Sequence, residues 1–248
     1  MLKLAPKVFN PLDSLNDPRL AGAFSCRSHG NMSLSYGHTE SALDNRKNFL
    51  TSLDIDYRDL VCAQQQHGNN VRYAGKESRG RGALDYAAAV PDTDGFITDL
   101  KRLPLAIFTA DCLSIFLYDP ARPAIGLLHA GWRSSRENIV LRAIELMRSK
   151  FGTKPAELRV GFGPCIRSCC YEVSAEFNNY FPAGLVERSG RLYLDLAAVN
   201  RKQLIACGVR EENTGDAGYC TYCANTDFFS FRKEVQDSGR MLSVIMLR

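Results

Sequence analysis

Two histidines and one cysteine, His67, Cys112 and His129, are the residues whose types and placement most directly indicate chemistry. Each lies where an apolar run gives way to polar residues, as expected at a strand end, where sheets commonly build their sites. Two imidazoles and one thiolate form a borderline-soft ligand set that suits Zn²⁺, and three protein ligands would leave a fourth position for water or substrate. If the three segments converge, the sequence predicts a catalytic rather than a structural zinc site.

Spacing alone leaves other interpretations of these residues open, because they form neither a CxxC nor an HExxH signature. The histidines could be hydrogen-bonded core side chains, with Cys112 a buried thiol. Cys112 could also be a nucleophile activated by His129, as in cysteine hydrolases. Cu²⁺ is the alternative metal, because blue-copper sites use one Cys and two His, but the four histidines of the chain are too few for multicopper catalysis.

The chain holds nine cysteines, and most of them are predicted to be buried thiols in a reducing cytosol. Cys165, Cys169 and Cys170 lie close together in sequence without accompanying histidines, so small buried thiols are favoured over a second metal site. Cys220 and Cys223 form a CxxC motif with no partner pair, which favours structural thiols over a redox or metal function.

The elements that must position the candidate ligands are predicted from apolar patterns. Three buried strands in quick succession, at 105–108, 114–118 and 124–128, indicate a sheet core. A helix is expected to begin at Ser134, which has the capping-box spacing with Glu137, and to end at Gly152. The other predicted elements are a helix at 41–50, a strand at 60–63, a strand at 158–162, a helix at 195–208 and a terminal strand at 241–247. No repeat or linker interrupts this pattern, so we expect one compact α/β domain over residues 1–248, with mixed sheets flanked by helices.

Composition bounds the class of protein. With 45% hydrophobic and 23% charged residues among 248, the chain has the composition of an ordinary globular protein. Its formal charge of +4 comes without a run of five Lys or Arg, so a nucleic-acid partner is not favoured, whereas a mild positive bias suits small anionic ligands. No apolar run approaches the ~20 residues that span a bilayer, and the first residues lack the apolar core of a signal peptide. We therefore expect a cytoplasmic protein that binds no membrane, as a monomer or small homo-oligomer.

Several longer motifs follow one another along the chain. They are Gln66-His67-Gly68, Asp92-Thr93-Asp94-Gly95, Thr109-Ala110-Asp111-Cys112, His129-Ala130-Gly131-Trp132-Arg133, Gly163-Pro164-Cys165-Ile166, Cys169-Cys170-Tyr171-Glu172-Val173 and Phe229-Ser230-Phe231-Arg232. In this order they resemble the laccase-domain or multicopper-polyphenol-oxidase-like proteins, a family now regarded as purine nucleoside phosphorylases. The resemblance covers nearly the whole chain.

The resemblance implies a mixed α/β sandwich and a zinc site on His67, Cys112 and His129. It implies phosphorolysis of adenosine, inosine, guanosine and methylthioadenosine, with adenosine deamination as a side activity. Copper-dependent phenol oxidation and a role in peptidoglycan editing are also attributed to the family, so a copper oxidase and a cell-wall interaction protein are the alternatives.

Phosphorolysis of a purine nucleoside requires groups that hold phosphate beside the ribose carbon. Arg46 is the first candidate, because the predicted helix could point it inward and a guanidinium can bind phosphate with two hydrogen bonds. Arg133 is the second candidate, since it follows the His129 segment; for either arginine, a surface salt bridge is the alternative. Asp111 is too close to Cys112 in sequence to share its metal comfortably, and is expected to support the ligands, carry a proton or cap a turn.

Trp132 and Phe24 could stack on a purine, although packing in the core is the favoured role for each.

Overall fold

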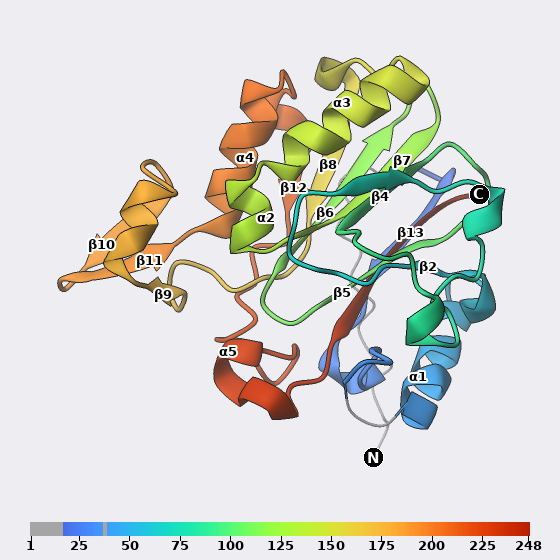
Figure 1. Cartoon of the computed structure of the whole chain (residues 1–248), viewed down its shortest axis with the longest axis horizontal. Helices are drawn as coiled ribbons and strands as arrows, with labels where there is room; N and C mark the ends of the chain where they lie inside the picture. The colour runs from blue at the N-terminus through green and yellow to red at the C-terminus, as the bar shows by residue number, and fades with distance from the viewer. Residues whose placement is uncertain (1–16, 37–38) are drawn as a thin grey trace.

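A six-stranded mixed sheet forms the centre of the computed structural model, which describes residues 17–36 and 39–248 (Figure 1). Its strand order is β12 (Thr214–Asp216), β8 (Arg159–Phe162), β6 (Leu113–Asp119), β7 (Ala124–Ala130), β4 (Gly95–Thr98) and β3 (Val71–Tyr73). The outer pairs β12–β8 and β3–β4 are parallel, and the inner pairs are antiparallel. Strands β6 and β7 are buried along their whole length, because both faces of the sheet are covered.

The two faces of β6 bury different sets of side chains, as the alternation along a strand requires. Leu113, Ile115 and Leu117 point toward a core shared with helix α3 (Ile139–Phe151) and helix α4 (Leu196–Ala206). Phe116 and Tyr118 point the other way, into a core shared with a second sheet. This arrangement explains why the strand has a continuous apolar sequence.

The second sheet has four strands, in the order β1 (Leu20–Phe24), β13 (Met241–Leu247), β5 (Leu105–Thr109) and β2 (Val61–Cys62). Its inner face packs on β6 and β7, and its outer face is covered by helix α1 (Thr39–Thr51), which buries Ala42, Phe49 and Leu50. The predicted sandwich of mixed sheets flanked by helices is therefore confirmed.

The start of the long helix differs from the prediction. Ser134 lies inside a short helix, α2 (Trp132–Arg136), and does not open α3. The residue that caps α3 is Asn138, whose φ of 56° is left-handed and whose side chain accepts a hydrogen bond from the backbone N–H of Leu141. The capping-box prediction was wrong because a left-handed Asn can break and restart a helix within a single polar segment. The predicted end at Gly152 is confirmed, and so is the predicted start of the next helix at Asp195, which is the N-cap of α4.

Two smaller pieces lie beside the sandwich. A three-stranded sheet of β9 (Glu172–Val173), β10 (Leu185–Arg188) and β11 (Arg191–Leu194) projects at the left of Figure 1. Helix α5 (Phe231–Glu234) lies between β12 and β13 in the chain. No helix within the described ranges is long and apolar enough to cross a membrane.

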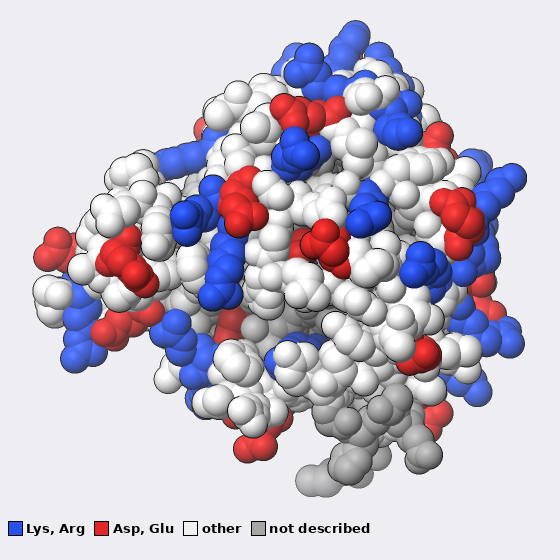
Figure 2. Space-filling view, in the orientation of Figure 1, with Lys and Arg blue, Asp and Glu red and all other residues white. Residues whose placement is uncertain are grey.

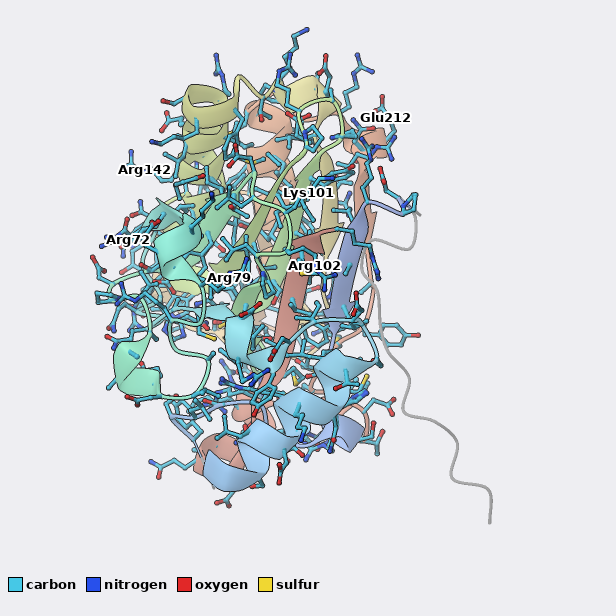
Figure 3. All side chains as sticks on the ribbon, turned by 90° about the vertical axis from the view of Figure 1, so that its right-hand side faces the viewer. Arg72, Arg79, Lys101, Arg102, Arg142 and Glu212 are labelled. Atoms are coloured by element: carbon cyan, nitrogen blue, oxygen red, sulfur yellow. The ribbon has the colours of Figure 1, made fainter. Side chains whose placement is uncertain are left out.

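Charged side chains of both signs are mixed on the face shown in Figure 2, and no large area there carries one sign. The face turned by 90° in Figure 3 shows Arg72, Arg79 and Arg142 on different segments, and Lys101 and Arg102 together in the loop between β4 and β5. Arg79 and Arg102 are paired with Asp59 and Asp54. The modest excess of positive charge is therefore not gathered into one large patch on either of these two faces.

Candidate metal centre

The structure brings His67, Cys112 and His129 together, with one ligand atom of each lying within 4.8 Å of the others. His129 is the penultimate residue of β7, and Cys112 directly precedes β6. These two strands pair antiparallel with Ser114 opposite His129, so the start of one strand lies beside the end of the other. His67 lies in the loop after β2 and has a left-handed φ of 61°. The centroid of its ring is 4.7 Å from that of the His129 ring.

The carboxylate of Asp94 holds two of the three candidate ligands in place. Its Oδ1 accepts hydrogen bonds from the backbone N–H of His67 at 2.9 Å and lies 2.7 Å from His129 Nδ1. Its Oδ2 accepts from the backbone N–H of Gln66 at 3.0 Å and of Gly68 at 2.9 Å. Because an ionised carboxylate only accepts, Nδ1 of His129 carries the proton and its Nε2 is left as the metal-binding lone pair.

Asp94 was not among the predicted site residues. Its sequence signal was limited to the Asp92–Gly95 motif, and nothing in the local pattern connects it to backbone groups 26 to 28 residues earlier. Only the parallel pairing of β3 and β4 places the two segments side by side.

Burial alone would raise the pKa of the Cys112 thiol, but the charge and hydrogen bonds of His129 and His67 outweigh it and lower the pKa to about 6. Burial likewise acts to lower the pKa of His129, but the thiolate of Cys112 and the carboxylate of Asp94 raise it to about 9. The site without metal therefore holds a thiolate beside an imidazolium at neutral pH. A thiolate is the form that a soft metal binds.

Gly131 leaves room for the cluster. A Cβ added there would lie 3.1 Å from both Cys112 Sγ and His67 Cδ2, which is closer than carbon and sulfur normally pack. A side chain at this position would push two ligands apart.

The three candidate ligands line a cavity of about 580 Å³, within the size range of pockets that bind small molecules. Four arginines also line it: Arg46, Arg133, Arg232 and Arg240. Its aromatic lining includes Phe108, Trp132, Tyr171 and Phe231. Among the described residues of the lining, Asp111 is the single carboxylate, so the cavity favours an anionic ligand with a flat apolar part.

Arg46 points inward, as expected, but its guanidinium is already engaged. Nε donates to the carbonyl of Met32 at 2.7 Å, and Nη1 donates to the carbonyls of Gly82 and Ala83. The side chain is buried and lies over the ring of Phe108. No carboxylate of the described residues pairs with it, so the salt-bridge alternative is wrong for Arg46. Its main duty is to hold three loop carbonyls, which weakens it as the first candidate for phosphate.

Arg133 is differently placed. It is the second residue of α2, is exposed, and has its guanidinium carbon 4.6 Å from the ring centroid of Trp132. Within the described parts of the chain its guanidinium has no hydrogen bond and no ion pair, so no salt bridge engages it there. Arg232, which the sequence analysis named only as the last residue of the Phe229–Arg232 motif, donates from Nη1 to the carbonyl of Glu172 and lies over the ring of Tyr171.

Asp111 performs a structural task on the far side of Cys112. Its Oδ1 accepts a hydrogen bond from the hydroxyl of Thr221 at 2.6 Å, and its Oδ2 accepts from the backbone N–H of Arg232 at 2.6 Å. Both oxygens are therefore used to fix the cavity wall. Of the predicted roles, support of the site is the one that these two hydrogen bonds favour.

The two aromatic candidates differ in position. Phe24 is fully buried, packs on Phe228 and is absent from the described lining, so it belongs to the core. Trp132 both packs on Phe177 and lines the cavity.

The structure also corrects the interpretation of the other cysteines. Cys169 and Cys170 lie against Cys220 and Cys223, so the CxxC motif does have a partner pair. Cys169 and Cys223 are exposed rather than buried. The pairing could not be predicted from the sequence, because the two segments are far apart in the chain and become neighbours only when it folds.

Comparison with known proteins places this geometry in a family. Residues 21–248 match the family described as multi-copper polyphenol oxidoreductase laccase, which confirms the resemblance seen in the sequence. Purine nucleoside phosphorylase YlmD of Geobacillus stearothermophilus is 34% identical over 225 residues, covering 87% of this chain and 82% of that protein. Adenosine deaminase RL5, from an unknown prokaryotic organism, is 31% identical over 212 residues, covering 82% of this chain and 80% of that protein.

The fold is shared with a solved structure of the same family. The crystal structure of the hypothetical protein YfiH from Bacillus licheniformis matches with a TM-score of 0.92 and 29% sequence identity, covering 98% of this chain and 97% of that one.

Proposed function

This chain belongs to the multi-copper polyphenol oxidoreductase laccase family, and we propose that it is a zinc-dependent purine nucleoside phosphorylase. The metal is assigned to His67, Cys112 and His129, whose converging nitrogen and sulfur atoms suit Zn²⁺. The substrates are assigned as adenosine, inosine, guanosine and methylthioadenosine, with phosphate as the second substrate. The observation that carries the proposal is a cavity of arginines and aromatic rings that contains this ligand set and whose described lining has one carboxylate, already hydrogen-bonded.

Phosphate is assigned to Arg133, with Arg232, which lines the same cavity, as the second contact. The guanidinium of Arg133 is held by its stacking on Trp132, and this contact leaves its N–H donors available for phosphate. A phosphate held there would attack the ribose carbon that bears the base, and the bond from that carbon to the purine nitrogen would break with its electron pair going to the purine. The aromatic walls at Trp132, Tyr171 and Phe231 provide flat apolar surface for the purine.

Zn²⁺, when bound, supplies a Lewis acid that can polarise a substrate oxygen or nitrogen. The chain itself keeps two of the candidate ligands in the form that binds metal. Asp94 fixes the tautomer of His129, and the lowered pKa of Cys112 keeps that thiol deprotonated at neutral pH. Asp94 and Asp111 thus position groups around the cavity.

Adenosine deamination is the second candidate, and the observation that favours it is the likeness to adenosine deaminase RL5. Zinc deaminases use a free carboxylic acid as general acid and base beside the metal. The one carboxylate in the described lining, Asp111, has both oxygens occupied. Phosphorolysis places less demand on such a group because phosphate is already an anionic nucleophile. We therefore propose phosphorolysis as the main reaction and deamination as the side activity.

The test is whether the zinc-loaded protein releases adenine and ribose-1-phosphate from adenosine only when phosphate is present, followed by chromatography. Phosphate-dependent release is expected. Formation of inosine alone, at a rate independent of phosphate, would make the protein a deaminase. Neither product, from a protein shown to contain zinc, would overturn the proposal.

A further inference from the structure

Four cysteine side chains meet at the surface, away from the candidate metal centre. Cys169 and Cys170 lie in the turn after β8, and Cys220 and Cys223 lie in the loop between β12 and α5. All four sulfur atoms lie within 4.8 Å of one another. The Sγ of Cys223 is 3.6 Å from that of Cys169 and 3.3 Å from that of Cys170.

The backbone holds the two segments in register independently of the thiols. Cys165 and Cys220 form a parallel β-bridge. The backbone N–H of Cys165 donates to the carbonyl of Tyr219 at 3.3 Å, and that of Thr221 donates to the carbonyl of Cys165 at 3.1 Å. The cluster is therefore built by main-chain pairing and does not depend on a chance meeting of flexible side chains.

We propose that Cys169, Cys170, Cys220 and Cys223 form a second, structural zinc site with four thiolate ligands. A zinc–sulfur bond is about 2.3 Å, so a tetrahedral site places its sulfurs about 3.8 Å apart. The observed separations of 3.3 and 3.6 Å lie slightly below that value, and no two of the four sulfurs are more than 4.8 Å apart. All four residues are free thiols. Four protein ligands leave no open position, which is the mark of a structural rather than a catalytic site.

The surroundings of the cluster suit the negative charge that four thiolates bring. The sulfur of Cys220 accepts hydrogen bonds from the backbone N–H groups of Arg167, Tyr222 and Cys223, so the second and third residues after the first cysteine of the CxxC motif both donate to it. Arg188 donates to the carbonyls of Ser168 at 2.9 Å and of Cys169 at 3.2 Å, which places a guanidinium beside the cluster. Hydrogen bonds and cations of this kind orient metal ligands and stabilise their charged form.

The cluster would fasten together two parts of the cavity wall. One of its segments leads into Tyr171, and the other leads into Phe231 and Arg232, all of which line the cavity. Thr221, which lies inside the CxxC motif, donates its hydroxyl to Asp111 next to Cys112. A metal on the four thiols would therefore fix the wall that faces the catalytic ligands, without itself contacting substrate.

The test measures bound zinc in protein purified under reducing conditions. A chain with both sites should hold two zinc ions, and His67→Ala/His129→Ala should hold one. Adding Cys169→Ser/Cys223→Ser to that variant should remove the remaining ion. Cys207→Ser, which changes a half-buried thiol outside the cluster, is the matched control and should lose none.

Cobalt supplies a readout that does not depend on activity or on the stability of the serine variants. Folded His67→Ala/His129→Ala should take up one Co²⁺ and show the absorption of a tetrahedral thiolate site, including sulfur-to-metal charge transfer. The proposal is overturned if this variant binds neither zinc nor cobalt. It is also overturned if the four cysteines of the freshly purified protein are joined as disulfides. Because both experiments remove the catalytic ligands, their outcome is separate from that of the phosphorylase assay.

Discussion

Replacing Asp94 by asparagine keeps the size of a buried side chain and changes one acceptor oxygen into a donor NH₂ group. If the amide nitrogen takes the place of Oδ2, it faces the backbone N–H groups of Gln66 and Gly68, donor against donor. If it takes the place of Oδ1, it faces the N–H of His67 and must donate to His129 Nδ1. That second arrangement moves the His129 proton to Nε2, where the metal lone pair was.

The magnitude follows from the groups left without partners. A fully buried donor that loses its acceptor costs about 1–3 kcal/mol, and these two donors are part-buried, so the first arrangement lowers the free energy of unfolding by about 1–3 kcal/mol in all. Loss of a carboxylate that orients a metal-bound histidine lowers metal affinity about 10- to 100-fold. Asp94→Asn is therefore expected to show both effects together, because one side chain holds the His67 loop and the His129 ring.

Zinc affinity is measured by competition with a chromophoric chelator, and stability by chemical denaturation of the metal-free protein. Asp92→Asn is the control: it makes the same chemical change two residues away, at an exposed side chain whose φ of 44° asparagine tolerates. Its effect on stability should stay within about 0.5 kcal/mol. Zinc affinity of Asp94→Asn within a factor of two of the wild type would refute the role given to this carboxylate.

Three further outcomes follow from the same geometry. Arg133→Gln should raise the KM for phosphate about 10- to 100-fold, the cost of one or two charge-assisted hydrogen bonds. The control is Arg136→Gln, one turn along α2 and outside the described lining of the cavity, which should leave that KM unchanged. Steady-state kinetics with varied phosphate measures both. Gly131→Ala should weaken zinc binding by about 1–3 kcal/mol, because its Cβ would crowd Cys112 and His67; unchanged affinity in a chelator titration would argue against that crowding. Zinc affinity should rise about tenfold per pH unit between pH 6 and 9. In that range Cys112 is already a thiolate, and zinc must displace one proton from His129. A zinc affinity that does not change with pH in that range would contradict the assigned charge states.

Much of the fold could be predicted from sequence because its central strands are buried on both faces. Such strands are continuous apolar runs, and the predicted strands at 105–108, 114–118 and 124–128 differ from β5, β6 and β7 only at their ends. The start of α3 could not be predicted in the same way. A capping box and a left-handed Asn138 are both polar signals, and only tertiary packing decides between them.

The three candidate ligands could be proposed from residue type and strand ends, but the residues that hold them could not. Asp94 acts on Gln66, His67, Gly68 and His129 through hydrogen bonds that cross between strands. Local sequence patterns carry no record of such bonds. For the same reason Arg46 resembled a ligand-binding arginine, although its partners are backbone carbonyls of distant loops.

The two carboxylates nearest the candidate metal centre share a physical role that bears on its chemistry. Asp94 anchors the His67 loop and His129 on one side of Cys112, and Asp111 anchors Thr221 and the backbone of Arg232 on the other. A carboxylate whose oxygens each accept hydrogen bonds from fixed donors is held in place, and protonating it would weaken those bonds. Both carboxylates therefore serve first to fix the geometry of the site. A reaction whose nucleophile is already anionic, such as the proposed phosphorolysis, demands the least proton transfer from them.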